Sequence, residues 1–261
     1  MKTLIRDLLA RTRTSLVWWI LGLLAMAVYV VLIYDSIGAM SELGDLYRSY
    51  PPAVRKLIGD VDITTLNGWM QVEFLSWLPL ILAIYAGIFV GSSISKESEQ
   101  GTLDFVLGLP VTRSQFLLSR LVGGLVNLAI VCLIVFAVLT AGVALAGHTP
   151  APERYALALL NAFLLASALM AAFMGLATLI DEQARLSGIT LGGTLVLYVA
   201  TGALKAAGAP DPVLWLMPFE HYHAAQAMSG GGLPVAPLLL LILAAAVAAG
   251  AGLWRYNQRD V

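Results

Sequence analysis

The sequence predicts an all-α polytopic membrane protein with six transmembrane helices. Apolar residues make up 59% of the 261 residues and charged residues only 12%, whereas soluble domains carry about 25% charged side chains. Six stretches contain no Asp, Glu, Lys or Arg, and each is near or above the roughly 20 residues with which a helix crosses the hydrocarbon core. We therefore treat residues 1–261 as a single transmembrane domain.

The expected spans follow from these charge-free stretches. A lone charge at the centre of a span costs about 2.5 to 3.5 kcal/mol, so an uninterrupted stretch marks a helix that can insert into lipid. The six expected spans cover residues 15–34, 74–95, 121–147, 155–180, 186–206 and 235–254.

Residues 1–14 precede the first span and are basic. On a helical wheel the apolar side chains share one arc and the charged side chains fill the rest, which predicts an amphipathic helix at the membrane interface. A frayed basic tail is the alternative. A cleaved secretory signal is disfavoured, because the following apolar stretch is longer than the core of about 7 to 15 residues that such signals have.

Lys and Arg are unevenly distributed among the connections between the spans. If both termini lie inside, the cytoplasmic segments hold ten of the fifteen Lys and Arg residues, and the outer segments hold five. Positively charged residues concentrate in cytoplasmic loops. We therefore expect a multi-pass protein of the plasma membrane with both termini in the cytoplasm.

The cytosolic connection between the second and third spans, residues 96–120, is the most structured polar segment of the sequence. Thr112 and Gln115 have the spacing of a capping box. This motif predicts a helix that begins at Arg113 and continues into the third span.

A short apolar element, residues 103–109, precedes this helix. Thr102 is its expected cap, and Pro110 separates it from the helix that follows. Exposed apolar residues edged with acidic side chains are typical of a docking surface for a soluble partner. Packing of the same residues on their own bundle is the alternative.

The outer connection before the last span, residues 208–234, is too apolar for a solvated loop and too interrupted by Pro and Gly for a span. It therefore predicts a re-entrant or interfacial element. Irregular backbone at membrane depth is tolerated only where other parts of the protein cover it.

The segment after the second span resembles that of the permease subunits of type-2 ATP-binding-cassette (ABC) transporters. The pattern is Glu-x-Glu-x-Gly-Thr-Leu, followed at the family's spacing by Leu, Pro, a branched residue and Arg. The matching residues are Glu97, Glu99, Gly101, Thr102, Leu103, Leu107, Pro110, Val111 and Arg113. The resemblance covers the whole chain, including the basic start, the six spans and Pro218-Phe219 ahead of the last span.

This resemblance implies a complex of two permease chains, identical or related, with two cytosolic ABC ATPase subunits. ATP and Mg would be bound by the ATPase, and no cofactor by this chain. In the family the segment after the second span contacts the ATPase, and most members are exporters of amphipathic or lipophilic compounds. The implied ATPase-coupling residues are Glu97, Glu99, Gly101, Thr102, Leu103, Leu107, Pro110 and Arg113.

The sequence contains little that indicates catalysis within the chain itself. No Gly-x-x-x-x-Gly-Lys-Ser/Thr loop is present, and no lysine follows a glycine, so the chain lacks a recognisable phosphate-binding loop. His148, His221 and His223 all fall on the outer side without the spacing of a zinc protease. A net charge of −1 gives no reason to expect nucleic acid as a partner.

Two other functions remain open on the residues alone. A secondary carrier or channel would also be a helical bundle, but carriers usually place ionisable groups at mid-membrane. A non-transport membrane assembly factor is the second alternative. Gly87 with Gly91 and Gly188 with Gly192 have small-xxx-small spacing, which suits close helix packing within the chain or a dimer face.

Overall fold

The structure, a computed structural model, describes residues 2–36, 49, 62–95, 112–180 and 182–258. These residues form helices joined by turns, with no strand among them. Six helical stretches in this part of the chain are long and apolar enough to cross a membrane. The predicted all-α polytopic fold is confirmed.

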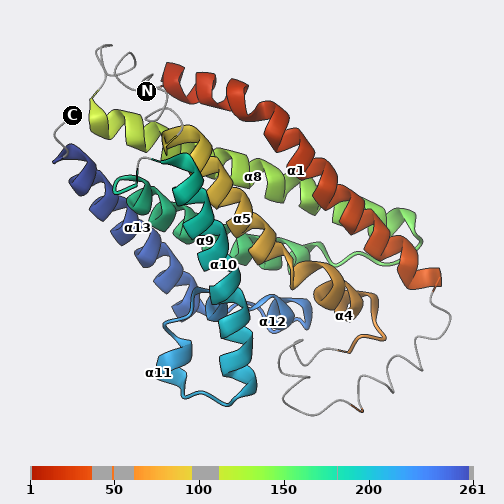
Figure 1. Cartoon of the computed structure of the whole chain (residues 1–261). Coiled ribbons are helices and arrows are strands. Elements are labelled where there is room, and N and C mark those ends of the chain that lie inside the picture. Colours follow the sequence, from red (N-terminus) through yellow and green to blue (C-terminus); the bar gives the residue numbers. More distant parts are fainter. Residues whose placement is uncertain (1, 37–48, 50–61, 96–111, 181, 259–261) are drawn as a thin grey trace.

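The helices run roughly along one axis, with α5 and α9 at the centre of the bundle (Figure 1). α1, α10 and α13 lie at its edges, and few of their residues are buried. In chain order the elements are α1 (Lys2–Ser36), α4 (Leu66–Met70), the π-helix η1 (Gln71–Leu75), α5 (Leu78–Val90), the π-helix η2 (Gly91–Ser95), α8 (Arg113–Leu145), α9 (Pro152–Ala177), α10 (Gln183–Ala206), α11 (Asp211–Leu214), the 3-10 helix η3 (Pro218–His221), α12 (Ala224–Met228) and α13 (Val235–Asn257).

The first helix is longer than a membrane span requires. α1 has 35 residues, which correspond to about 52 Å at 1.5 Å per residue. Figure 1 shows its first turns at an angle to the rest. These turns are helical rather than frayed, and their apolar side pairs with α8: Leu8 is buried against Gly123, and the Asn127 amide donates to the hydroxyl of Thr12 at 3.1 Å.

The second span is irregular and begins earlier than expected. Its helical stretch starts at Leu66 rather than at residue 74, because the Thr65 side chain caps the helix by accepting from the N–H of Gly68. Glu73, expected in the outer connection, therefore lies inside the helical stretch, within η1. A charge-free stretch marks the part of a helix that suits lipid, not the turns that extend beyond it.

The third and fifth spans have clear end signals. The capping box of Thr112 and Gln115 is present and starts α8, as predicted. α8 ends in a Schellman motif in which Gly147 has a φ of +81°, and the end of α10 has the same arrangement around Gly208, with a φ of +70°. Glycine is favoured at both positions because a side chain would strain a left-handed residue.

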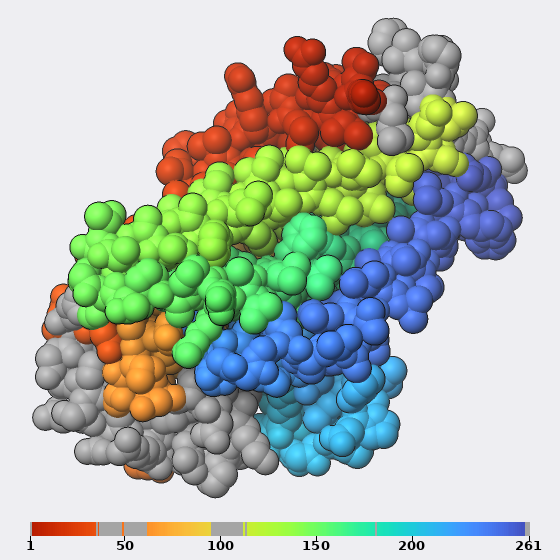
Figure 2. Space-filling view, turned by 180° about the vertical axis from the view of Figure 1, so that it is seen from behind, coloured from red at the N-terminus to blue at the C-terminus, as the bar shows by residue number. Residues whose placement is uncertain are grey.

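The fourth span joins the two halves of the bundle. α9 contacts α5 on one side and α13 on the other, and its backbone approaches α13 closely at Gly175 and Gly252. A Cβ atom on Gly252 would lie 3.3 Å from the Cα atom of Gly175. Figure 2 shows α8 and α13 meeting at one end of the molecule and diverging toward the other.

The two ends of the bundle carry different parts of the chain. One end holds both termini, the end of η2 and the start of α8 (Figure 1). The opposite end holds α4, α11 and α12. The expected coupling segment is residues 96–120, of which the structure describes 112–120. These described residues and the expected outer segment, residues 208–234, lie at opposite ends of the bundle.

Candidate coupling site and outer segment

The sequence-predicted coupling residues fall largely on undescribed positions. Glu97, Glu99, Gly101, Thr102, Leu103, Leu107 and Pro110 lie outside the described residues, whereas Arg113 is the first residue of α8. The structure describes the residues on both sides of the undescribed stretch 96–111. η2 ends at Ser95, and Thr112 caps α8 at the same end of the bundle.

The start of α8 is fastened to the end of α13. The hydroxyl of Ser114 donates to Oδ1 of Asn257 at 2.8 Å. In the same turns of the two helices, the rings of Phe116 and Tyr256 are stacked with centroids 6.2 Å apart. Both aromatic side chains are almost completely buried, so the helix that leaves the coupling segment starts from a fixed base.

A buried arginine completes this base. The Arg120 side chain is only 3% exposed, and its guanidinium carbon lies 4.7 Å from the centroid of the Phe116 ring. This distance is within the range of a cation–π contact, which is worth more when the cation is desolvated. The sequence patterns did not predict Phe116, Arg120 and Tyr256 as a unit. The available signal was the aromatic residue four positions before an arginine at the edge of a span.

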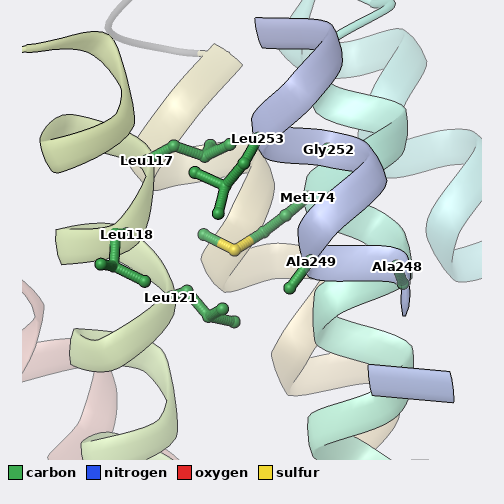
Figure 3. Close-up of a pocket in the computed structure, with 8 residues that line it drawn as sticks. All are labelled: Leu117, Leu118, Leu121, Met174, Ala248, Ala249, Gly252 and Leu253. Atoms are coloured by element: carbon green, nitrogen blue, oxygen red, sulfur yellow. The ribbon is translucent and has the colours of Figure 1, made fainter. Parts of the chain in front are cut away.

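The junction of α8, α9 and α13 just below this base is closed by apolar side chains (Figure 3). Its eight lining residues leave a cavity of about 10 Å³, room for one water molecule at most. They come from three helices: Leu117, Leu118, Leu121, Met174, Ala248, Ala249, Gly252 and Leu253. This junction is a packing contact and not a ligand site.

At the opposite end, residues 208–234 are folded against the bundle. The side chain of Asn161, fully buried in α9, donates to the carbonyl oxygen of His221 at 3.0 Å and accepts from the N–H of His223 at 2.6 Å. Arg154 donates to the carbonyl oxygen of Met228 at 2.9 Å. Helix α9 thus supplies hydrogen-bond partners for this irregular backbone, which a re-entrant or interfacial element requires.

Charged and titratable groups of the outer segment gather near the end of α10. Lys205 and Glu220 form a salt bridge of 2.8 Å, and the His221 ring bonds the carbonyl oxygen of Trp215 at 2.9 Å. Burial, with the nearby Lys205 charge, lowers the pKa of His223. No group of three or more His, Cys, Asp or Glu residues in the described part of the chain could hold a metal ion.

Two further contacts join the outer regions to a kink in the second span. The hydroxyl of Tyr222 donates to the carbonyl oxygen of Leu75 at 2.8 Å, and the hydroxyl of Tyr198 donates to the next carbonyl, that of Ser76, at 3.2 Å. Pro79 follows shortly after and has no N–H to offer to Leu75.

Two apolar grooves open on the sides of the bundle. The groove between α1 and α5 has a volume of about 480 Å³ and is lined mainly by α1, including Trp18, Trp19 and Met26. The groove between α8 and α9 has a volume of about 340 Å³ and includes Cys132. Both are large enough for part of a lipid-like molecule, and neither is enclosed.

Comparison with protein families assigns nearly the whole chain. The model of the family described as ABC-2 family transporter protein matches residues 5–261. Comparison with curated proteins finds no match. The match includes the expected coupling segment, the six spans and residues 208–234, and membership of this family implies a membrane permease with a partner ATPase. The chain belongs to the ABC-2 family of transporter proteins.

Proposed function

We propose that this chain is the permease subunit of an exporter that moves an amphipathic or lipophilic compound across the plasma membrane. ATP and Mg bind to a separate cytosolic ATPase, whose hydrolysis drives the movement. The observation that carries this proposal is where the chain enters and leaves the undescribed stretch 96–111 of the coupling segment. The end of η2 and the start of α8 lie at the end of the bundle that holds the first turn of α1 and the last turn of α13, in a chain matched by the transporter family over residues 5–261.

The distribution of charge supports a cytoplasmic position for this end. Ten of the fifteen Lys and Arg residues fall in segments that would then be cytoplasmic. The contacts among Phe116, Arg120 and Tyr256 support this coupling, because they join the start of α8 to the end of α13. A movement that the ATPase imposes on the start of α8 would therefore move the third and sixth spans together.

A second permease chain is part of the proposal, and α10 carries the proposed contact face. Gly87 and Gly91 pack against α10 of the same chain. A Cβ atom on Gly87 would lie 2.8 Å from the hydroxyl oxygen of Thr190, and one on Gly91 would lie 2.8 Å from that of Ser187. Gly188 and Gly192 face open space. Exposed Leu195, Val196 and Val199 continue their stripe along the helix, so small residues and then larger aliphatic residues offer a partner helix a close approach.

The α1–α5 groove supports the proposed substrate class. Its volume of about 480 Å³ is bounded by two indole rings, aliphatic side chains and one hydroxyl, that of Ser15. Such a surface suits a molecule with an apolar body and a small polar part.

The test is reconstitution with the cognate ATPase. The permease and the ATPase are co-expressed, purified through a tag on the permease and reconstituted into proteoliposomes with the ATPase facing outward. We expect stoichiometric co-purification, vanadate-sensitive ATP hydrolysis and ATP-driven movement of a fluorescent phospholipid into the inner leaflet or lumen. Absence of the ATPase from the purified sample would contradict the assignment; movement outward would contradict export.

Charge reversal tests the coupling segment separately. The double variant Glu99→Lys, Arg113→Glu is expected to lose ATPase co-purification and transport at least tenfold while inserting normally. Arg185→Glu, an exposed reversal at the start of α10 on the same side, is the matched control and should retain both. Normal transport by the double variant would show that these residues do not couple.

A further inference from the structure

The kink in the second span, at Leu75–Pro79, receives a hydrogen bond from a residue in a distant part of the chain. η1 ends at Leu75 and α5 begins at Leu78. Because Pro79 has no N–H, the Leu75 carbonyl cannot receive the usual hydrogen bond from the residue four positions later. The Tyr222 hydroxyl, 147 positions along the chain, donates to this carbonyl at 2.8 Å.

A second tyrosine reinforces the same place. The Tyr198 hydroxyl donates to the carbonyl oxygen of Ser76 at 3.2 Å, and its ring lies edge-on to the ring of Phe219, with centroids 5.2 Å apart. Phe219 lies three residues before Tyr222. We call Tyr198, Phe219 and Tyr222 the outer latch, because together they join α10 and the outer segment to the kink.

The latch is positioned by helices other than the second span. Asn161 of α9 holds the backbone on both sides of Tyr222. The salt bridge from Lys205 to Glu220 ties η3 to the end of α10 at 2.8 Å. The kink therefore meets hydroxyl groups whose positions are set independently by α9 and α10.

The other end of the second span leads directly to the coupling segment. From the kink, α5 and η2 continue without a break to Ser95, the last residue before residues 96–111. A rigid helix transmits a displacement at one end to the other end, and proline kinks and π-helical turns are where helices bend. Two places of this kind lie on the path from Ser95: η2 itself, which is a π-helix, and Leu75–Pro79. The part of a movement at Ser95 that η2 does not absorb is expected to bend the span at Leu75–Pro79, against the latch.

Resting on the proposed function, we propose that the outer latch holds the second span in the nucleotide-free conformation and releases during each ATP cycle. Tyr222 and Tyr198 are positioning residues: they act through the backbone carbonyl oxygens of Leu75 and Ser76. Release exchanges two hydroxyl–carbonyl hydrogen bonds for other partners and frees residues 208–234 from the span that carries the coupling segment. The outer side of the permease thereby responds to the ATPase on the opposite side.

The test removes one hydroxyl at a time. Tyr222→Phe and Tyr198→Phe keep the rings and delete the bonds to the kink. Tyr34→Phe is the matched control, since the Tyr34 hydroxyl donates to the carbonyl oxygen of Thr64 at 2.8 Å, away from the kink. Hydrogen–deuterium exchange of residues 71–80 and vanadate-sensitive ATP hydrolysis are measured on the reconstituted complex with its ATPase.

We expect residues 71–80 of nucleotide-free Tyr222→Phe to exchange about three to ten times faster than in the wild type, the factor that one ordinary hydrogen bond corresponds to. The wild type should reach this exchange rate only when trapped with ADP and vanadate. Basal hydrolysis should rise by a similar factor in both latch variants, with Tyr34→Phe unchanged.

Two outcomes would overturn the latch. In the first, exchange and hydrolysis in both latch variants match those of Tyr34→Phe. In the second, the latch variants exchange faster by the same factor in the nucleotide-free and the trapped states, and their hydrolysis rate is lower. A tyrosine with a merely structural role would give this second result. A wild-type chain that fails to bind its ATPase would instead overturn the proposed function.

Discussion

Tyr256, in the last turn of α13, stacks its ring on Phe116, in the first turn of α8, with centroids 6.2 Å apart and an interplanar angle of 20°. The two residues are 140 positions apart in the sequence, yet each is almost completely buried by this end of the bundle. The contact joins the helix that leaves the coupling segment to the helix that ends the fold.

A double-mutant cycle measures this contact. Phe116→Leu and Tyr256→Leu should each lower the thermal stability of the detergent-solubilised chain. The double variant should lose less stability than the sum of the losses in the two single variants, because the interaction between the two rings can be lost only once. We expect a coupling of about 0.5 to 1.5 kcal/mol, the range of aromatic pairs. Additive losses would show that the rings do not interact.

The two glycine pairs should respond differently to a methyl group. A Cβ atom on Gly87 would lie 2.8 Å from Oγ1 of Thr190, a buried and rotationally restricted residue. Gly87→Ala is therefore expected to destabilise the chain by about 1 to 3 kcal/mol through overpacking. Gly188→Ala meets nothing within 4 Å and should leave thermal stability unchanged or raise it, since alanine favours a helix by about 1 kcal/mol over glycine.

A larger side chain extends this prediction to the second permease chain. Gly188→Leu should fold with the stability of the wild type, because the site is open within one chain. Its dimer fraction, measured by cross-linking in membranes, should fall if α10 is the contact face. If the dimer fraction of Gly188→Leu equals that of the wild type, the dimer interface must lie on another helix.

Hydropathy was enough to predict the six spans, but their limits needed other signals. Polar turns extend α1 and α8 to Lys2 and Arg113, and the sequence predicted the second start through the Thr112 capping box. The start of the second span at Leu66 was missed, because Glu73 interrupts the apolar stretch. A charge in an irregular outer turn does not stop a helix.

The internal contacts were beyond prediction from one sequence. The Gly87–Gly91 pair could face a partner or its own bundle, and only the position of Thr190 assigns it inward. The Tyr222–Leu75 hydrogen bond depends on a kink and on a segment 147 residues away. Such pairings follow from how helices are arranged, which local patterns do not encode. The coupling residues from Glu97 to Pro110 remain predictions, since they lie outside the described residues.

Acidification should destabilise the outer segment through His223. Burial, with the nearby Lys205 charge, lowers the pKa of this histidine below its usual 6.5, so the folded chain binds a proton less readily than the unfolded chain. The stability that follows from this is present above pH 6.5 and is lost as the pH falls from 6.5 through the lowered pKa. Thermal unfolding of the detergent-solubilised chain between pH 7.5 and 5 measures it.

Substitution identifies the group responsible. His223→Gln keeps a polar side chain without a titratable ring and should flatten the stability profile between pH 6.5 and 5. His148→Gln, at another outer histidine, should retain the slope of the wild type. An unchanged slope in His223→Gln would assign the acid sensitivity to a different group.

Asn161 is expected to be the most sensitive polar residue of the outer half. It is fully buried, and its amide satisfies the carbonyl oxygen of His221 and the N–H of His223 at once. Asn161→Leu keeps a side chain that branches at Cγ, although a larger one, and leaves both backbone groups without their partner. A buried unsatisfied polar group costs about 1 to 3 kcal/mol. Because two such groups are left, the variant should lose about 2 to 6 kcal/mol of stability.

The location of the damage separates this role from a general packing defect. Residues 208–234 should become accessible to protease added on the outer side of Asn161→Leu, since their backbone is released from α9. Asn127→Leu is the matched control: Asn127 is equally buried, but its amide donates to the side chain of Thr12 at 3.1 Å and not to backbone. That variant should keep the outer segment protected. Equal cleavage in both variants would contradict this role. It would mean that the bundle as a whole, and not the two hydrogen bonds from Asn161, protects residues 208–234 from the protease.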